Sequence, residues 1–292
     1  MKKSTTILAG LFILLLAVFY LGSLKEKKQE RGVVGPVLEV EKDRITQVEI
    51  TKDQAKIVLA KQKGEWQISD PLKYRANQAY VEDLLGNILS LEIDALASEL
   101  PEKQTFYGVD TGGIIVKVSA EDRPLSSFII GKQSYPHTYL RPLNSTQIYR
   151  VKGVSRWYYT RQISDWRDKT IFDFDTASVK EITLSETEAV IRLLREGDLW
   201  KMESKGEESP ADTEAVNQLL STASTLKAND FKDTAPERDF SRPDFRVAIT
   251  FDSGETRGLS LLAEDESQTQ YLAQKRMAIR PSFCFTKRLC QP

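Results

Sequence analysis

The order of apolar and polar positions along this chain occurs twice, over residues 45–151 and again over residues 179–283. The two patterns are offset by 131 to 135 positions, which aligns Trp66 with Trp200. A repeat of this length has the size of a whole domain, whereas solenoid units have periods of about 20 to 50 residues. The sequence therefore predicts two tandem domains with one shared architecture.

Each copy opens with a pattern that is typical of an antiparallel meander. Apolar and polar residues alternate at first, a short aliphatic run follows, and a glycine-containing turn precedes a third strand that carries the tryptophan. The predicted strands lie near residues 48–50, 56–60 and 66–68 in the first copy, and near 182–184, 189–194 and 200–202 in the second.

A helix is predicted after the meander in both copies. Pro71 and Pro210 are expected to end the preceding sheet, and Asn77 and Asp212 are suitable N-cap residues at matching positions. Apolar residues then recur with helical spacing, so one face of each helix is expected to be buried. These residues are Val81, Leu84, Leu85, Ile88 and Leu91 in the first copy, and Val216, Leu219, Leu220, Ala223 and Leu226 in the second.

Further strands are predicted after each helix. In the first copy they are residues 114–118, a run over 128–130 that is expected to end at Gly131, and a closing pair at 139–141 and 148–151. In the second copy they are residues 245–251, 259–261 and 271–273, with a turn at 252–254 and no closing element. The predicted fold class is α+β, in which each repeat is a mostly antiparallel sheet packed with one main helix.

The N-terminus predicts a transmembrane helix before the repeats. Lys2 and Lys3 precede an uncharged run over residues 5–24, and twenty helical residues span about 30 Å, the thickness of the hydrocarbon core. The run ends in a poor cleavage site, and no cysteine follows it directly, so an uncleaved signal anchor is favoured over a signal peptide. Basic residues on both flanks leave the positive-inside rule ambiguous. Because short leading tails usually stay in the cytosol, residues 25–292 are expected on the extracytoplasmic (periplasmic) side of the cytoplasmic membrane.

Five segments are expected along the chain, and the fourth contains an aromatic cluster. Trp157-Tyr158-Tyr159 is interpreted either as the seam between the repeats or as an exposed patch for a partner. The segments are a transmembrane signal anchor over 1–24, a stalk over 25–40, the first α+β repeat over 41–153, a bridge over 154–175 and the second α+β repeat over 176–292.

Composition excludes several classes of function. The 41 basic and 42 acidic residues leave a net charge of −1, and the body has no basic cluster, so nucleic acid is not an expected partner. The two cysteines, Cys284 and Cys290, exclude a disulfide-rich scaffold, while one late disulfide and two unpaired thiols both stay open. No second cysteine pair or nearby histidine indicates a zinc site, and no cofactor is expected.

No set of residues predicts catalysis, so catalytic, cofactor-binding and metal residues are each assigned as none. His137, the single histidine, is assigned to a surface loop before a strand and not to a general base. The glycines of residues 108–113 lack a phosphate-loop ending and are explained by a turn that enters a strand. Asp168, Asp173 and Asp175 lie close together in sequence, but acidic links between domains are common, so an acid/base role is not favoured.

Trp66 and Trp200 are interpreted as core residues and not as a platform for carbohydrate. They occupy matching positions beside a predicted turn, where a tryptophan usually packs over the adjacent helix. The repeat is therefore expected to duplicate a core and not an active site.

Several short motifs occur in the order and spacing of a known family. They are Gly64-Glu65-Trp66-Gln67-Ile68 followed by Pro71, Tyr107-Gly108-Val109, Ile129-Ile130-Gly131, Tyr139-Leu140-Arg141, Tyr149-Arg150-Val151 and Arg167-Asp168-Lys169. On these motifs the chain resembles the bacterial domain-of-unknown-function family 4340 (DUF4340). The second copy departs from the pattern at Phe240-Ser241-Arg242-Pro243. The resemblance implies a membrane-anchored extracytoplasmic protein beside a gliding-type ABC transporter, and it supplies no catalytic residues.

Two functions from different classes fit these observations. The first is a non-enzymatic accessory, scaffold or binding protein, held in the inner membrane through residues 5–24 and associated with ABC transporter subunits. The second is an envelope polysaccharide hydrolase with paired carboxylates about 5 to 10 Å apart in a cleft. The anchor, the duplicated domain and the missing catalytic set favour the first.

Overall fold

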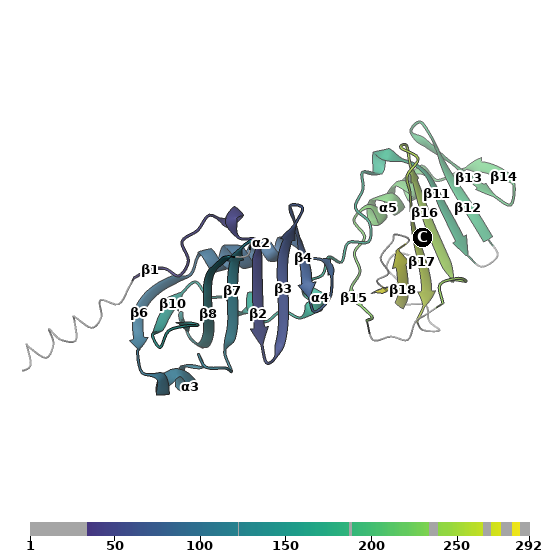
Figure 1. The fold of residues 1–292 in the computed structure, drawn as a ribbon. Coiled ribbons are helices and arrows are strands. Elements are labelled where there is room, and N and C mark those ends of the chain that lie inside the picture. The colour runs from purple at the N-terminus through teal and green to yellow at the C-terminus, as the bar shows by residue number, and fades with distance from the viewer. Residues whose placement is uncertain are drawn as a thin grey trace, which may run out of the picture. The chain divides into compact units, whose positions relative to one another are not determined.

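Two compact units make up the chain, Met1–Asp168 and Lys169–Pro292. The computed structural model describes residues 34–121, 123–186, 189–233, 239–264, 270–275 and 282–286. Each unit contains an antiparallel sheet and a twelve-residue helix (Figure 1). The predicted transmembrane helix at residues 5–24 lies outside the described residues, and within them no helix is long and apolar enough to cross a membrane.

In the first unit, ten described strands form one sheet in the order β1-β6-β10-β9-β8-β7-β2-β3-β4-β5. The strands are β1 (Gly35–Pro36), β2 (Gln47–Lys52), β3 (Ala55–Gln62), β4 (Glu65–Asp70), β5 (Tyr74–Arg75), β6 (Glu92–Ser98), β7 (Ile114–Ala120), β8 (Arg123–Ser134), β9 (His137–Pro142) and β10 (Ile148–Lys152). The helices are η1 (Lys42–Arg44), α2 (Gln78–Leu89), η2 (Pro101–Lys103), α3 (Gln104–Tyr107), η3 (Arg156–Tyr159) and α4 (Ile163–Trp166).

Local sequence explains the predicted meander and the start of the helix. Residues with positive φ close the turns between its strands, at Asp53 (48°), Gln54 (69°) and Gly64 (89°). Asn77 is the N-cap of α2, as predicted, because its side chain accepts a hydrogen bond from Tyr80 N at 3.3 Å. These local signals set the bounds of β2, β3, β4 and α2.

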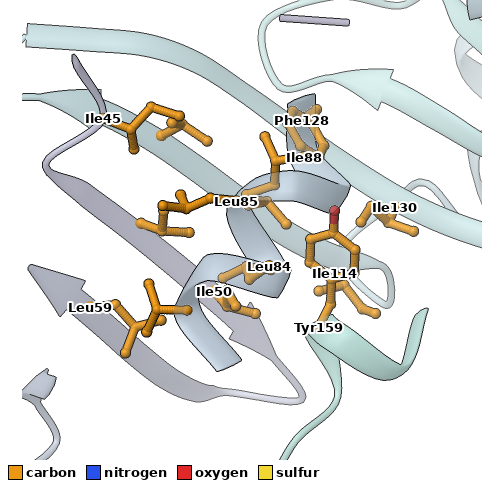
Figure 2. Packing of buried hydrophobic residues seen from close by; sticks show 14 of the residues in the cluster. Ile45, Ile50, Leu59, Leu84, Leu85, Ile88, Ile114, Phe128, Ile130 and Tyr159 are labelled. Carbon is orange, nitrogen blue, oxygen red and sulfur yellow. The ribbon is translucent and has the colours of Figure 1, made fainter. Parts of the chain in front are cut away.

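The helix α2 packs its predicted apolar face on the sheet. Leu84, Leu85 and Ile88 lie among side chains of the strands (Figure 2). Burial of one such side chain stabilises a fold by about 1.5–3 kcal/mol. The strand residues of this core alternate along β2, β7 and β8, since every second residue of a strand shares a face; they are Val48, Ile50, Ile114, Val116, Val118, Phe128 and Ile130.

A smaller apolar cluster covers the opposite face of the same sheet. Ile129 belongs to this cluster, whereas its neighbour Ile130 belongs to the main core, because successive strand residues point to opposite faces. Val109, which follows α3, and Ile148 of β10 complete the cluster. The segment around α3 is therefore packed onto the sheet on the side away from α2.

The prediction that a strand ends at Gly131 is wrong. β8 continues to Ser134, with a bulge between Ile130 and Gln133. Gly131 is required for another reason, since a Cβ at this position would collide with the backbone oxygen of Tyr107. The glycine thus gives the α3 segment room to cross the strand.

Residues that follow β10 close the first unit. Gly153 reverses the chain with a φ of +84°, and η3 then packs against α2. Further along, Trp166 O accepts a hydrogen bond from Asn77 N at 2.8 Å. The expected bridge, residues 154–175, is therefore split between the two units. Its residues up to Asp168 belong to the first unit, and the later ones belong to the second.

Residues 34–40 fall within the expected stalk and lie on the first unit. β1 pairs with β6 at the sheet edge, and the apolar side chains that follow it pack against the main core. These side chains are Val37, Leu38 and Val40.

In the second unit, nine described strands form a sheet in the order β14-β13-β12-β11-β16-β17-β18-β19-β15. Read from the opposite end, and apart from its additional edge strand β1, the first sheet has the same order, so β11–β14 correspond to β2–β5, and α5 corresponds to α2. The elements are η4 (Thr176–Ser178), β11 (Val179–Glu186), β12 (Ala189–Glu196), β13 (Leu199–Ser204), β14 (Glu207–Pro210), α5 (Thr213–Ser224), β15 (Asp230–Phe231), β16 (Phe245–Phe251), β17 (Thr256–Ala263), β18 (Gln270–Lys275) and β19 (Ser282–Thr286).

Asp212 is the N-cap of α5, and Pro210 ends the meander before this helix, both as predicted, since Pro210 is the last residue of the edge strand β14. In the first unit the matching expectation is wrong, because the sheet continues past Pro71 into β5. The expectation that the second unit has no closing element is also wrong. β19 is a closing element, and it pairs with both β18 and β15. The question of a disulfide between Cys284 and Cys290 depends on Cys290, which lies outside the described residues.

Candidate functional site

The two matched tryptophans are core residues, as predicted. Trp66 and Trp200 are only 3% and 2% exposed. The backbone of Trp66 is clamped by Gln78 of α2, whose Oε1 accepts from Trp66 N at 2.8 Å and whose Nε2 donates to Trp66 O at 2.9 Å. In the second unit the guanidinium carbon of Arg195 lies 5.0 Å from the Trp200 ring centroid. At this burial neither ring offers a face to a carbohydrate.

The prediction that His137 lies in a surface loop is wrong. It is the first residue of β9, and its Nε2 lies 3.2 Å from Asp94 Oδ2. Arg150 and Lys152 of β10 also contact this carboxylate, at 2.6 and 2.7 Å. Hydrogen bonds from Lys152 and then Arg150 lower the pKa of Asp94 to about 2. So weak a base does not accept protons at neutral pH, and its ion pairs with Arg150 and Lys152 instead tie β6 to β10.

The glycine-containing segment 108–113 is a structural turn. Gly108 ends α3 in the left-handed conformation with a φ of +67°. The Asp110 carboxylate accepts from Gly112 N at 3.1 Å, and the buried Arg141 donates to Val109 O at 2.9 Å. The polar groups of this segment therefore bind one another and Arg141.

The acidic residues of the expected bridge hold structural contacts. Asp168 lies 3.3 Å from Arg75 in the first unit, and Asp175 in the second unit caps η4 by accepting from Ala177 N at 3.0 Å. Asp173 is an exposed residue of the second unit. Within the described part of the chain, no three histidine, cysteine, aspartate or glutamate side chains come together in a way that would hold a metal ion.

The predicted aromatic segment contributes to a distinctive surface of the first unit. We define the aromatic–arginine cluster as Tyr80 of α2, Trp157 and Tyr158 of η3, Arg161, and Trp166 of α4. Trp157 is 59% exposed, whereas Arg161 and Trp166 are buried. The guanidinium carbon of Arg161 lies 3.7 Å from the Tyr80 ring centroid and 3.8 Å from that of Trp157. Tyr158 and Trp166 follow at 5.4 Å each, so four rings surround one cation.

Tyr159, the next residue of η3, is buried in the core beside α2 (Figure 2). Its hydroxyl donates to Asn87 Oδ1 of α2 at 2.9 Å, and Asn87 Nδ2 donates to Gly153 O at 2.6 Å. Burial raises the pKa of the Tyr159 phenol. These bonds fix η3 on the helix, and they give Trp157 and Arg161 a rigid support.

Arg161 is a buried cation whose donors are unused. Its Nε, Nη1 and Nη2 have no hydrogen-bond partner among the residues that the structure describes. Burial lowers its pKa, and the nearby Tyr80, Asp83 and Asp165 oppose this shift. The Asp165 carboxylate instead accepts from Gln162 N at 3.1 Å. A buried charge without a hydrogen-bonded counterion is unfavourable, so this is the position in the described chain best suited to receive an anion.

The aromatic–arginine cluster lies inside a known domain family. The family model "Domain of unknown function (DUF4340)" matches residues 66–244, more than half of the chain. The chain belongs to this family. The DUF4340 match reaches into both units and contains every member of the aromatic–arginine cluster. No curated protein matches the chain, and no solved structure matches it.

Sequence reasoning finds Trp157 but misses Arg161 and Tyr80. One signal was present, since Arg161 is a single cation between the Trp157-Tyr158-Tyr159 run and Trp166. Tyr80 lies in the first turn of α2, and only the fold brings it to residue 161. The cluster as a whole was therefore beyond prediction from sequence.

Proposed function

We propose that this DUF4340 protein is a non-enzymatic binding protein that is anchored in the cytoplasmic membrane by residues 5–24. Its two units are then extracytoplasmic. The observation that carries the binding role is the large exposed surface of Trp157 above the aromatic–arginine cluster. Tryptophan, tyrosine and arginine are the residue types that dominate binding energy at protein interfaces. The cluster is thus the docking surface in this proposal.

The partner that we propose is a gliding-type ABC transporter complex. The family resemblance supports this choice, and an apolar run of membrane-spanning length supports a location in the same membrane. In this role the protein is an accessory or scaffold subunit.

A polysaccharide hydrolase is the alternative, and the structure offers it less support. Such an enzyme needs two free carboxylates across a sugar-binding cleft. Asp168 and Asp175 instead hold an ion pair and a helix cap. The binding role is therefore the better supported of the two functions.

Photo-crosslinking tests the proposed role in the intact protein. The full chain carries benzoylphenylalanine in place of Trp157, is irradiated in native membranes, and its products are identified by mass spectrometry. Phe106, which is 67% exposed in the same unit, is the matched control position. We expect transporter subunits to be captured from position 157 and not from position 106. Capture of no membrane protein, or of the same set from both positions, would contradict the proposal.

Reporter fusions test the proposed orientation. Alkaline phosphatase fused after Pro292 is active only outside the cytoplasm, whereas green fluorescent protein exported in unfolded form does not fluoresce there. We expect phosphatase activity and no fluorescence. The reverse result would place the body in the cytoplasm and exclude an extracytoplasmic partner.

A further inference from the structure

The guanidinium of Arg161 has donors without an acceptor. The residue is 7% exposed, and its three nitrogens lack a hydrogen-bond partner among the described residues. We propose that Arg161 binds a carboxylate on an acidic segment of a partner protein, at a site framed by Tyr80 and Trp157. The inference rests on the proposed binding function and specifies the chemistry that the partner must supply.

The rings hold the guanidinium without satisfying its buried donors. Tyr80 and Trp157 are inclined at 70° with centroids 6.3 Å apart, so they flank the cation on two sides. Their faces attract the positive charge and hold it in place, but they supply no anion. The planar fork of N–H donors matches the two oxygens of a carboxylate, which it binds through parallel hydrogen bonds.

The charges around Arg161 favour a singly charged ligand. Asp83 of α2 and Asp165 of α4 both lie close enough to stabilise the cation without a hydrogen bond to it. Two carboxylates at this range repel a doubly charged phosphate more strongly than one carboxylate group. Asp83 should also weaken the binding of the ligand carboxylate, because its negative charge repels any anion that approaches.

Access to Arg161 requires Trp157 to move, which provides a signal for binding. The indole is more than half exposed, and its displacement would replace its contacts with Arg161 and Tyr80 by contacts of the ligand. The other three tryptophans, Trp66, Trp166 and Trp200, are almost completely buried. Trp166 also lies in the cluster, 5.4 Å from Arg161, so Trp157→Phe is needed to separate the fluorescence of Trp157 from that of Trp166.

The test uses the full chain in detergent micelles and blocked hexaglutamate as the probe. We expect a saturable change in tryptophan fluorescence with hexaglutamate and none with hexaglutamine. Trp157→Phe should greatly reduce the change, and Arg161→Gln should weaken binding at least about tenfold, the scale of a lost buried charge pair. Arg161→Lys should bind with intermediate affinity, since it keeps the charge and loses the fork. Asp83→Asn should bind more tightly than the wild type, because it removes the repelling charge.

Three results would overturn the inference. They are an equal response to hexaglutamine, an unchanged affinity in Arg161→Gln, and a stronger response to inorganic phosphate than to hexaglutamate. Near-ultraviolet circular dichroism establishes that each variant is folded, and Asp83→Asn tests the site even if Arg161→Gln does not fold. Transporter capture from position 157 without hexaglutamate binding would leave the proposed function standing and remove the carboxylate site. Hexaglutamate binding without capture of transporter subunits would keep the carboxylate site and contradict the proposed function.

Discussion

The ion pairs of Asp94 should make the stability of the folded protein depend on pH. Its folded pKa of about 2 lies below the ordinary value of an aspartate, so its ion pairs stabilise the fold above about pH 4. The contribution is lost as pH falls from about 4 towards 2, because the carboxyl is then protonated in both states. We expect the difference in unfolding free energy between wild type and Asp94→Asn, measured with urea, to shrink across this range.

Glu92 is the matched control for this pH dependence. It lies two residues earlier on β6, and none of the ion pairs of Asp94 involves it. Glu92→Gln should therefore follow the wild-type profile between pH 5 and pH 2. A difference between wild type and Asp94→Asn that stays constant over this range would mean that the ion pairs do not stabilise the folded state.

One methyl group added at Gly153 should strongly destabilise the folded protein. Its φ of +84° disfavours other residues, and a Cβ would also lie 2.7 Å from Ser90 O. We expect Gly153→Ala to lower the unfolding free energy by about 2 kcal/mol or more, since strain and collision add. Gly64→Ala is the control: φ is +89° but nothing lies within 4 Å, so only the strain of about 1–2 kcal/mol should remain. Equal losses in both variants would show that the close approach to Ser90 relaxes without cost.

At the scale of elements, the side-chain amide of Asn87 contributes to the attachment of η3 to α2. Asn87→Ala leaves the buried Tyr159 hydroxyl without its acceptor, which costs about 1–3 kcal/mol of unfolding free energy. Tyr159→Phe removes that hydroxyl. We therefore expect the double variant, measured by urea unfolding, to lose about 1 kcal/mol less than the sum of the two single losses. Additive losses would mean that the hydrogen bond does not couple the two elements.

Elements with long periodic patterns were predictable, and short or edge elements were not. The alternation of β2 and the helical spacing and N-cap of α2 gave elements that the structure confirms. β1 and β15 have two residues each, too few for any period, and β14 retains a proline because it is an edge strand. Gly131 misled the prediction, since its lack of a side chain serves the crossing of the α3 segment and not a strand end.

The candidate site was less predictable than the sheets for a physical reason. Trp157 stands out in the sequence because it begins a run of three aromatic residues, but its meaning depends on Arg161 and Tyr80. The contact between residues 80 and 161 is made only when η3 folds back on α2. No spacing rule connects such distant positions, so the site becomes visible only in the folded unit.

For the whole molecule, the shared strand order implies two cores that unfold separately. Trp66 is buried in the first unit and Trp200 in the second, and truncation of a buried tryptophan costs about 3–5 kcal/mol. Calorimetry of the full chain should therefore show two transitions. We expect Trp66→Ala to lower the midpoint of one transition and Trp200→Ala to lower that of the other. A single transition that both variants shift equally would mean that the two units fold cooperatively, and the duplicated sheet would then act as one body when a partner binds at Trp157.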